Sequence, residues 1–343
     1  MKNLELTYSP YNLRLNRTFQ TSRGDVSVRK GFVISLKSST KAEGIGEAAP
    51  LPEFGSESYE DDEEALNNIR LNLKLDLNNL IPSVEDNLSG FNHLPALRSG
   101  IEQAILNLIC VEKKTTLSEL FKKPVSRIIS VNGVVGLTEA DEAVNISREL
   151  KAKGFRTIKA KVGRENFNDD YKTVKNIRNE VGKNIKIRID ANGKWSVVEA
   201  ISNLKQFEDL DIEYIEQPVS SIEDFNEIQE AVSIPLAADE SLRCYEDAVK
   251  IIKNKLAYVL ILKPMMLGGL SVTMKIIDEA EKNNLKVVIT SSFETSIGRS
   301  IAVFAAGILK QPTAHGLAVA DYFQNTIAND PFPVSNGIIM LQP

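Results

Sequence analysis

The sequence predicts an α/β fold, in which a (β/α)₈-type barrel follows an N-terminal α+β capping domain. Three observations favour this architecture. From about residue 128 onward, short apolar runs alternate with amphipathic stretches at intervals of roughly 25 residues, which is typical of parallel strands joined by crossover helices. This part of the chain also supplies the about 200 to 250 residues that such a barrel needs. Before it, residues 4–36 alternate apolar and polar side chains, as antiparallel strands do.

The alternating part yields eight strand candidates, the last of them weak. They are residues 129–135, 157–162, 186–190, 212–216, 236–239, 258–263, 287–292 and 315–319. Helical periodicity lies between them, at 139–152, 170–181, 197–210, 222–231, 245–254 and 270–283. An open, doubly wound sheet is the structural alternative, but it would usually carry a Gly-rich phosphate turn, and residues 132–136 match that turn only weakly.

We predict that the chain forms two domains. We expect the capping domain to span residues 1–97, with the C-terminal residues 322–343 packing back on it. The barrel then spans residues 98–321 and contains seven or eight β/α repeats.

Composition places the chain among ordinary globular proteins. It has 343 residues, of which 43% are hydrophobic and 25% charged, and a formal net charge of −5. Basic residues form no block, so we expect no nucleic-acid partner. No stretch of about 18 apolar residues occurs, and the N-terminus lacks the apolar run of a signal peptide, so we expect no membrane association and a cytoplasmic location. Cys110 and Cys244 lie far apart, which favours a reducing compartment.

Two lysines share one face of the second predicted strand. In residues 157–162, Ile158 and Ala160 lie on one face and Lys159 and Lys161 on the other, because strand side chains alternate. Two neighbouring ammonium groups repel each other, so we expect the pKa of at least one of them to be lowered, which makes it a usable base near neutral pH. The alternative is an edge strand with two solvated lysines.

Carboxylates stand at the ends of three successive strands. Asp190, Glu216 and Asp239 end the third, fourth and fifth candidates, and the chemistry of such barrels belongs at these ends. We expect the three to converge, and a hard divalent cation would relieve their repulsion. Oxygen ligands without Cys or His favour Mg²⁺, with Mn²⁺ second. The alternative is a buried network of lysine–carboxylate ion pairs without a metal.

Lysines flank these acids on both sides. Lys159 and Lys161 come from the second strand and Lys263 from the sixth. A substrate carboxylate bound to the cation has a more acidic neighbouring carbon, and a lysine can remove the proton from it. The opposite lysine can stabilise negative charge or serve the other face. We therefore expect a small-molecule carboxylate substrate.

This constellation resembles the enolase superfamily in its muconate-lactonising branch. The matching motifs are Lys159-Ala-Lys161, Asp190-Ala-Asn192, Glu216-Gln-Pro218, Ala238-Asp239-Glu240 and Lys263-Pro264. The resemblance covers nearly the whole chain. It implies that Asp190, Glu216 and Asp239 bind Mg²⁺. It also implies that Lys161 and Lys263 form an acid/base pair on opposite faces of the substrate. Lys159, Asn192 and Glu240 would support them. The mandelate-racemase branch is disfavoured, because no histidine lies near the position of its base after strand seven.

Within this branch, three segments resemble o-succinylbenzoate synthases. They are residues 46–52, 291–298 and 314–317. The resemblance implies a carbon–oxygen lyase of menaquinone or phylloquinone biosynthesis. Such an enzyme dehydrates 2-succinyl-6-hydroxy-2,4-cyclohexadiene-1-carboxylate to o-succinylbenzoate, with Lys161 as the base and Lys263 over the ring. Ser291 and Ser292 would hold the succinyl carboxylate, and Arg23, in a capping loop, is a further candidate for a carboxylate contact.

Two alternatives stay open. An N-succinylamino acid racemase or a dipeptide epimerase would use the same two lysines for proton exchange. Residues 316–321 carry the single acid Asp321, where dipeptide epimerases usually have two, which counts against a substrate with a free amino group but not against an N-succinyl one. A non-catalytic ligand-binding barrel is a remote alternative, because all five proposed metal and acid/base residues are present. The sequence leaves homo-oligomerisation open.

Overall fold

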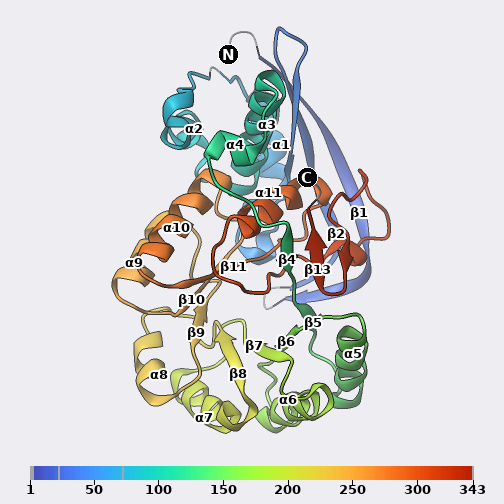
Figure 1. Cartoon of the computed structure of the whole chain (residues 1–343), viewed down its shortest axis with the longest axis vertical. Helices are drawn as coiled ribbons and strands as arrows, with labels where there is room; N and C mark the ends of the chain where they lie inside the picture. The colour runs from blue at the N-terminus through green and yellow to red at the C-terminus, as the bar shows by residue number, and fades with distance from the viewer. Residues whose placement is uncertain (1–3, 22–23, 72, 342–343) are drawn as a thin grey trace.

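The computed structural model describes residues 4–21, 24–71 and 73–341 and confirms the predicted α/β class (Figure 1). In the described N-terminal part, three strands form an antiparallel sheet in the order β1-β2-β3. These strands are β1 (Glu5–Thr21), β2 (Gly24–Lys37) and β3 (Glu43–Ala48). The helices that accompany this sheet are α1 (Tyr59–Asn68), α2 (Leu80–Leu88), α3 (Pro95–Lys113) and α4 (Leu117–Phe121).

Glycines let α3 lie directly on the third strand of this sheet. A Cβ on Gly46 would stand 2.0 Å from the carbonyl oxygen of Gly100, and one on Gly44 would stand 2.1 Å from that of Ala104. Such distances exclude any side chain, so the helix and the strand approach through their backbones. The helix is buried along most of its length and joins the N-terminal sheet to the barrel.

The rest of the chain is built from β/α repeats. In the described residues, a seven-stranded parallel sheet has the order β11-β10-β9-β8-β7-β6-β5. Its strands are β5 (Gly133–Val135), β6 (Thr157–Lys161), β7 (Lys186–Asp190), β8 (Ile212–Glu216), β9 (Leu236–Ala238), β10 (Val259–Leu262) and β11 (Lys286–Ile289). The helices are α5 (Ala140–Ala152), α6 (Phe167–Val181), α7 (Val197–Phe207), α8 (Phe225–Ala231), α9 (Tyr245–Lys253), α10 (Leu270–Lys282) and α11 (Ser296–Gly307).

Short 3₁₀ helices lie at Pro52–Phe54, Leu77–Asn79, Ser89–Phe91, Glu208–Leu210 and Ala320–Tyr322. The predicted barrel helices coincide with α5 to α10 apart from their ends, whereas α11 was not predicted. Among the described helices, none combines the length and the hydropathy that a bilayer crossing requires.

The first and last predicted barrel strands are shorter than expected. Residues 129–135 divide into β4 (Ile128–Ser130) and β5, and β4 pairs antiparallel with the C-terminal strand β13 (Ile338–Met340), which also pairs with β12 (Val334–Ser335). The predicted strand 315–319 is reduced to two parallel bridges, from His315 to Val131 and from Gly316 to Thr290. The hydrogen bonds of these bridges close the gap between β11 and the start of β5, so the sheet curls into a barrel.

Glu47 ties the N-terminal sheet to the barrel. Its side chain is fully buried and accepts hydrogen bonds from the backbone N–H groups of Thr295, at 2.9 Å, and Gly298, at 2.7 Å. The hydroxyl groups of Thr295 and Tyr11 also donate to it, at 2.5 and 2.6 Å. A carboxylate from β3 thus caps the N-terminus of α11, where backbone N–H groups have no partner within the helix.

C-terminal residues contact both parts of the chain. Phe323 forms a bridge with Leu15 of β1, and the backbone N–H of Gln324 donates to the carbonyl of Arg14 at 3.0 Å. Strand β13 instead pairs with β4 at the start of the barrel. The predicted domain limits stay a prediction.

Two carboxyl groups lie buried together beside the N-terminus of α3. Glu57 accepts the N–H of Leu97 through Oε1 at 2.9 Å, while its Oε2 and both oxygens of Asp62 receive no hydrogen bond within the described residues. Burial, and then the nearby charge of Glu57, raise the pKa of Asp62 to about 10. A single proton shared between the two groups gives each carboxyl a partner in the other.

We expect Asp62→Asn to remove a pH dependence of stability. The folded-state pKa of about 10 lies above the unfolded value of about 4. Unfolding therefore releases a proton between these values, and the stability of the wild type falls as the pH rises through this window. The melting temperature should decline less between pH 6 and pH 9 in the variant than in the wild type or in Glu64→Gln, an exposed control on the same helix. Parallel curves for all three proteins would contradict the shared proton.

We expect Glu47→Gln to weaken the connection between the two parts of the chain. The amide NH₂ would face groups that now donate to a carboxylate, at a cost of about 2–4 kcal/mol. Thermal unfolding should start several degrees lower, whereas Glu43→Gln, at an exposed position of the same strand, should behave as the wild type does. Equal midpoints for both variants would show that the α11 cap does not hold the structure together.

Candidate active site

The register of three barrel strands places the predicted charges next to one another. Parallel pairing sets Lys161 of β6 beside Asp190 of β7, and Asp190 beside Glu216 of β8. In the same way, Lys159 lies beside Arg188 one layer further down. Because all these strands end at the same rim, the charged side chains gather at the carboxyl-terminal mouth of the barrel.

The side chains form a dense network of ion pairs. Lys161 Nζ donates to Asp190 Oδ2 and to Asn192 Oδ1, each at 2.7 Å. Lys159 Nζ lies 2.8 Å from the same Asp190 oxygen and 2.5 Å from Glu216 Oε1. The structure thus brings Lys159, Lys161, Asp190, Asn192 and Glu216 together, while their predicted roles stay a prediction. The ion-pair alternative also describes what the side chains do in this structure.

This network shifts the pKa values of its members. Burial disfavours the charged form of Asp190, but the ammonium groups of Lys159 and Lys161 outweigh it and hold its pKa well below the usual range. Burial also disfavours charge on Lys159, but the carboxylates of Asp190 and Glu216 outweigh it and raise its pKa. The expectation that the paired lysines lower a pKa is therefore wrong for Lys159, because carboxylates surround its ammonium group.

Two buried carboxylate oxygens make a cation a good fit to this cluster. Glu216 Oε2 and Glu240 Oε2 receive no hydrogen bond from the described residues. Burial, and then the charge of Asp190, raise the pKa of Glu216 well above its ordinary value. Lysine ammonium groups lie between the acids, and the described residues contain no ready-made group of three metal-binding side chains. Carboxylate oxygens with unused lone pairs nevertheless suit Mg²⁺.

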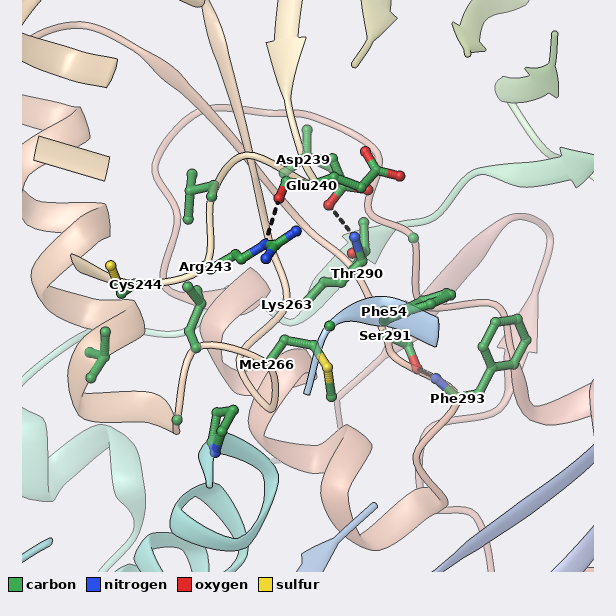
Figure 2. Close-up of a pocket in the computed structure, with 18 of the residues that line it drawn as sticks. Phe54, Asp239, Glu240, Arg243, Cys244, Lys263, Met266, Thr290, Ser291 and Phe293 are labelled. Carbon is green, nitrogen blue, oxygen red and sulfur yellow. Dashed lines mark hydrogen bonds and ion pairs between the residues drawn. The ribbon is translucent and has the colours of Figure 1, made fainter. Parts of the chain in front are cut away.

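Lys263 stands on the opposite side of the barrel from Lys161. It follows β10, and β7, β8 and β9 lie between β10 and β6 in the sheet. Its ammonium group donates to Asp239 Oδ1 and lies 5.3 Å from the centre of the Phe54 ring (Figure 2). Burial disfavours its charge, but Asp239 and then Glu240 outweigh burial and raise its pKa.

One cavity of about 640 Å³ contains both lysines. The barrel contributes the charged residues just described, together with Thr290, Ser291 and Phe293. The N-terminal part of the chain covers the cavity with residues of its loops and of α2 and α3, among them Glu53, Phe54, Gly55, Glu85, Asp86, Ser89, Asn92, His93, Pro95 and Arg98. The site is thus built from both parts of the chain.

The residues predicted to support the site or to bind substrate have different environments. Asn192 donates through Nδ2 to Glu240 Oε1 at 2.7 Å, so both lie in the network. Ser291 lines the cavity and accepts the N–H of Phe293 at 3.1 Å. Ser292 is buried beside it, does not line the cavity, and its hydroxyl has no hydrogen-bond partner among the described residues. Arg23 lies outside the described residues.

An aromatic wall was not anticipated from the sequence. Phe54 contacts Phe293 edge-to-face with ring centres 6.2 Å apart, and Phe293 contacts Tyr322 in the same manner at 5.4 Å. Phe293 has a φ of 59°, which a bulky residue rarely adopts, and buried Arg29 donates to its carbonyl oxygen at 3.1 Å. The signal was present in the sequence, because Phe54 and Phe293 lie in or next to two of the segments that resemble o-succinylbenzoate synthases.

His315 has a structural role in the barrel wall. It is buried, and its Nδ1 accepts the backbone N–H of Ile289 at 3.0 Å. Burial, and then the charge of Arg188, lower its pKa to about 3, so it is neutral at physiological pH. It therefore helps to close the barrel.

Comparison with curated proteins finds relatives with two kinds of activity. An o-succinylbenzoate synthase of Thermobifida fusca (strain YX) is 32% identical over 219 residues, which are 63% of this chain and 67% of that protein. An L-Ala-D/L-Glu epimerase of Bacillus subtilis (strain 168) is 26% identical over 322 residues, which are 89% of this chain and 85% of that protein.

Among solved structures, a dipeptide epimerase from Enterococcus faecalis V583, complexed with Mg and the dipeptide L-Leu-L-Tyr, has a TM-score of 0.87 at 24% identity. The match covers 98% of this chain and 96% of that one and supports the fold.

Residues 3–92 match the family model of the MenC N-terminal domain, and residues 141–343 match that of the enolase C-terminal domain-like family. The chain therefore belongs to the enolase superfamily.

Proposed function

We propose that this chain is an o-succinylbenzoate synthase, a lyase that dehydrates 2-succinyl-6-hydroxy-2,4-cyclohexadiene-1-carboxylate. The observation that carries the proposal is the placement of Lys161 and Lys263 on opposite sides of one cavity, beside a carboxylate cluster. The match to a curated synthase and to the MenC N-terminal domain supports this reaction over others of the superfamily.

Lys161 is suited to remove the proton next to the substrate carboxylate. As a neutral amine it has two N–H bonds, and the side chains of Asp190 and Asn192 provide an acceptor for each. The lone pair then points away from both acceptors, and Lys161 also lines the cavity in which a substrate would bind. A base held by two acceptors is already positioned before the substrate binds, which favours proton removal.

The same lysine completes the reaction. Once the carbon has given up its proton, Lys161 carries a positive charge and can donate that proton to the neighbouring hydroxyl group. The carbon–oxygen bond then breaks, water leaves, and the ring becomes aromatic. Atoms and charge balance, because the proton lost from carbon departs with the hydroxyl and Lys161 returns to its neutral form.

Lys263 and the aromatic wall suit the other face of the ring. The Lys263 ammonium group is fixed by Asp239 and rests against Phe54, so it can stabilise negative charge that develops on the ring. The rings of Phe54, Phe293 and Tyr322 provide an apolar surface, which suits a planar product and excludes water.

A divalent cation belongs to this proposal. Asp190, Glu216 and Asp239 would hold Mg²⁺, with Mn²⁺ as a substitute, while Glu240 and Asn192 support the ligands from behind. The bound cation would polarise the substrate carboxylate and so make the adjacent C–H bond more acidic.

A racemase or epimerase acting on N-succinylamino acids or dipeptides is the second candidate. Two lysines on opposite faces are what proton exchange at one carbon requires, and the epimerase relative covers more of this chain than the synthase does. The two functions differ in the step after proton removal. A synthase substrate carries a hydroxyl group on the next carbon and loses water, whereas a racemase substrate regains a proton on the opposite face.

We expect Mg²⁺-loaded wild type to consume the cyclohexadiene precursor and form o-succinylbenzoate, as followed by absorbance. Lys161→Ala should lower kcat by about 10²–10⁴-fold or more, because it removes the base. Lys183→Ala, at an exposed position just after α6, is the matched control and should keep the activity. If folded wild type does not consume the precursor, the synthase proposal is wrong. Deuterium exchange into N-succinylamino acids and dipeptides would then test the second candidate.

We expect Mg²⁺ to stabilise the wild type through Glu216. Ligand at about 100 times its dissociation constant adds about 2.7 kcal/mol to the stability of the folded state. Glu216→Gln should reduce the Mg²⁺-dependent rise in melting temperature strongly, since the amide is a poor cation ligand. Glu227→Gln, exposed on α8, should respond as the wild type does. If the Mg²⁺-dependent rise in melting temperature is unchanged in Glu216→Gln, then Glu216 does not bind the metal.

A further inference from the structure

Arg243 places a positive charge at the cavity from the loop that also carries Asp239. Its Nε donates to the backbone carbonyl of Glu240 at 3.1 Å, and its backbone N–H donates to Asp247 at 3.0 Å. Figure 2 shows the side chain reaching from this loop toward the space that Asp239 and Lys263 border. One edge of the guanidinium group is thereby fixed, while its terminal Nη groups have no hydrogen bond to any described residue.

Arg243 differs in this respect from the other lysines and arginines that line the cavity within the described ranges. The three site lysines are paired with carboxylates of the cluster. Lys275 pairs with Glu85 at 2.8 Å, and Arg98 pairs with Glu102 at 3.4 Å. No ion pair joins Arg243 to any described carboxylate, so its charge is available to a ligand.

We propose that Arg243 binds a second carboxylate of the substrate, carried on a chain remote from the reacting carbon. This inference rests on the proposed function, because it takes the lysine–carboxylate cluster as the reacting end of the cavity. A guanidinium group offers parallel N–H donors that match the two oxygens of a carboxylate. Fixing Nε in advance reduces the conformational entropy that binding has to overcome.

The charge of Arg243 also selects against other substrates. A succinyl chain ends in a carboxylate and would be attracted, whereas the ammonium group of a dipeptide would be repelled. Acidic residues line the cavity as well, namely Glu53, Asp86 and Glu246. Glu53 and Asp86 come from the N-terminal part of the chain, whereas Glu246 lies on α9 of the barrel, three residues after Arg243. The proposed subsite is therefore limited to the Nη groups of Arg243, which have no hydrogen bond to any described residue.

The test compares two ligands that differ only in the remote group. o-Succinylbenzoate has two carboxylates, and 2-butanoylbenzoate has a methyl group in place of the remote one. Calorimetry on Mg²⁺-loaded protein should show that the wild type prefers the dianion by about 10–100-fold, the usual size of a charge-assisted hydrogen-bonded pair. Arg243→Met should reduce this preference to less than about threefold, and Arg243→Lys should restore part of it. Arg156→Met, at an exposed arginine away from the cavity, should leave it intact.

Turnover and a second ligand pair separate this inference from the proposed function. With an active synthase, Arg243→Met should raise KM while leaving kcat within about threefold, because the lost contact is made equally in substrate and transition state. Without synthase turnover, the same comparison is made with N-succinyl- and N-butanoyl-L-phenylalanine. In that case the missing turnover refutes the synthase, and an Arg243-dependent preference for the N-succinyl ligand would still support the subsite. A wild type with no preference in either pair, or an Arg243→Met variant that keeps the preference, would overturn the inference.

Discussion

Charge compensation between neighbouring parallel strands is the constraint on which the site depends. Asp190 has no exposed surface, yet it is ionised, because Lys159 and Lys161 on the adjacent strand contact the same oxygen. A buried carboxylate without such partners would take up a proton, and a buried lysine without them would lose one. A shift of one residue in the pairing of β6 and β7 would turn these side chains to opposite faces. The register thus fixes the fold and the chemistry together.

The N-terminal part of the chain completes the cavity and is also anchored beside it. Glu47 caps the helix that follows the Ser291–Phe293 segment, and Arg29 holds the Phe293 carbonyl. These bonds stabilise the left-handed backbone of Phe293, which is strained, and set its ring against Phe54. The contacts that join the two parts of the chain therefore also position the aromatic wall, so a change at this interface alters the cavity.

The sequence alone was sufficient to predict the barrel and the charged residues at its mouth, because strand periodicity and the residues at strand ends can be recognised locally. The sequence was not sufficient to predict features that depend on contacts between distant segments. The last barrel strand is reduced to bridges at His315 and Gly316, and the expected drop in a lysine pKa is reversed at Lys159 by acids on two other strands. The cap from Glu47 joins residues about 250 positions apart, which no local pattern reveals.

In the proposed function, different groups of the cavity would have separate tasks. The two opposed lysines beside the carboxylate cluster would form the same carbanion in a lyase and in a racemase, so these residues alone do not decide the reaction. The outcome depends on whether the substrate brings a leaving group within reach of Lys161. In this proposal, Arg243 would select the substrate through a group remote from the reacting carbon, while the aromatic wall borders Lys263 at the ring itself. Because Arg243 and the wall residues lie outside the barrel strands, they can change without disturbing the strand register that holds the lysines.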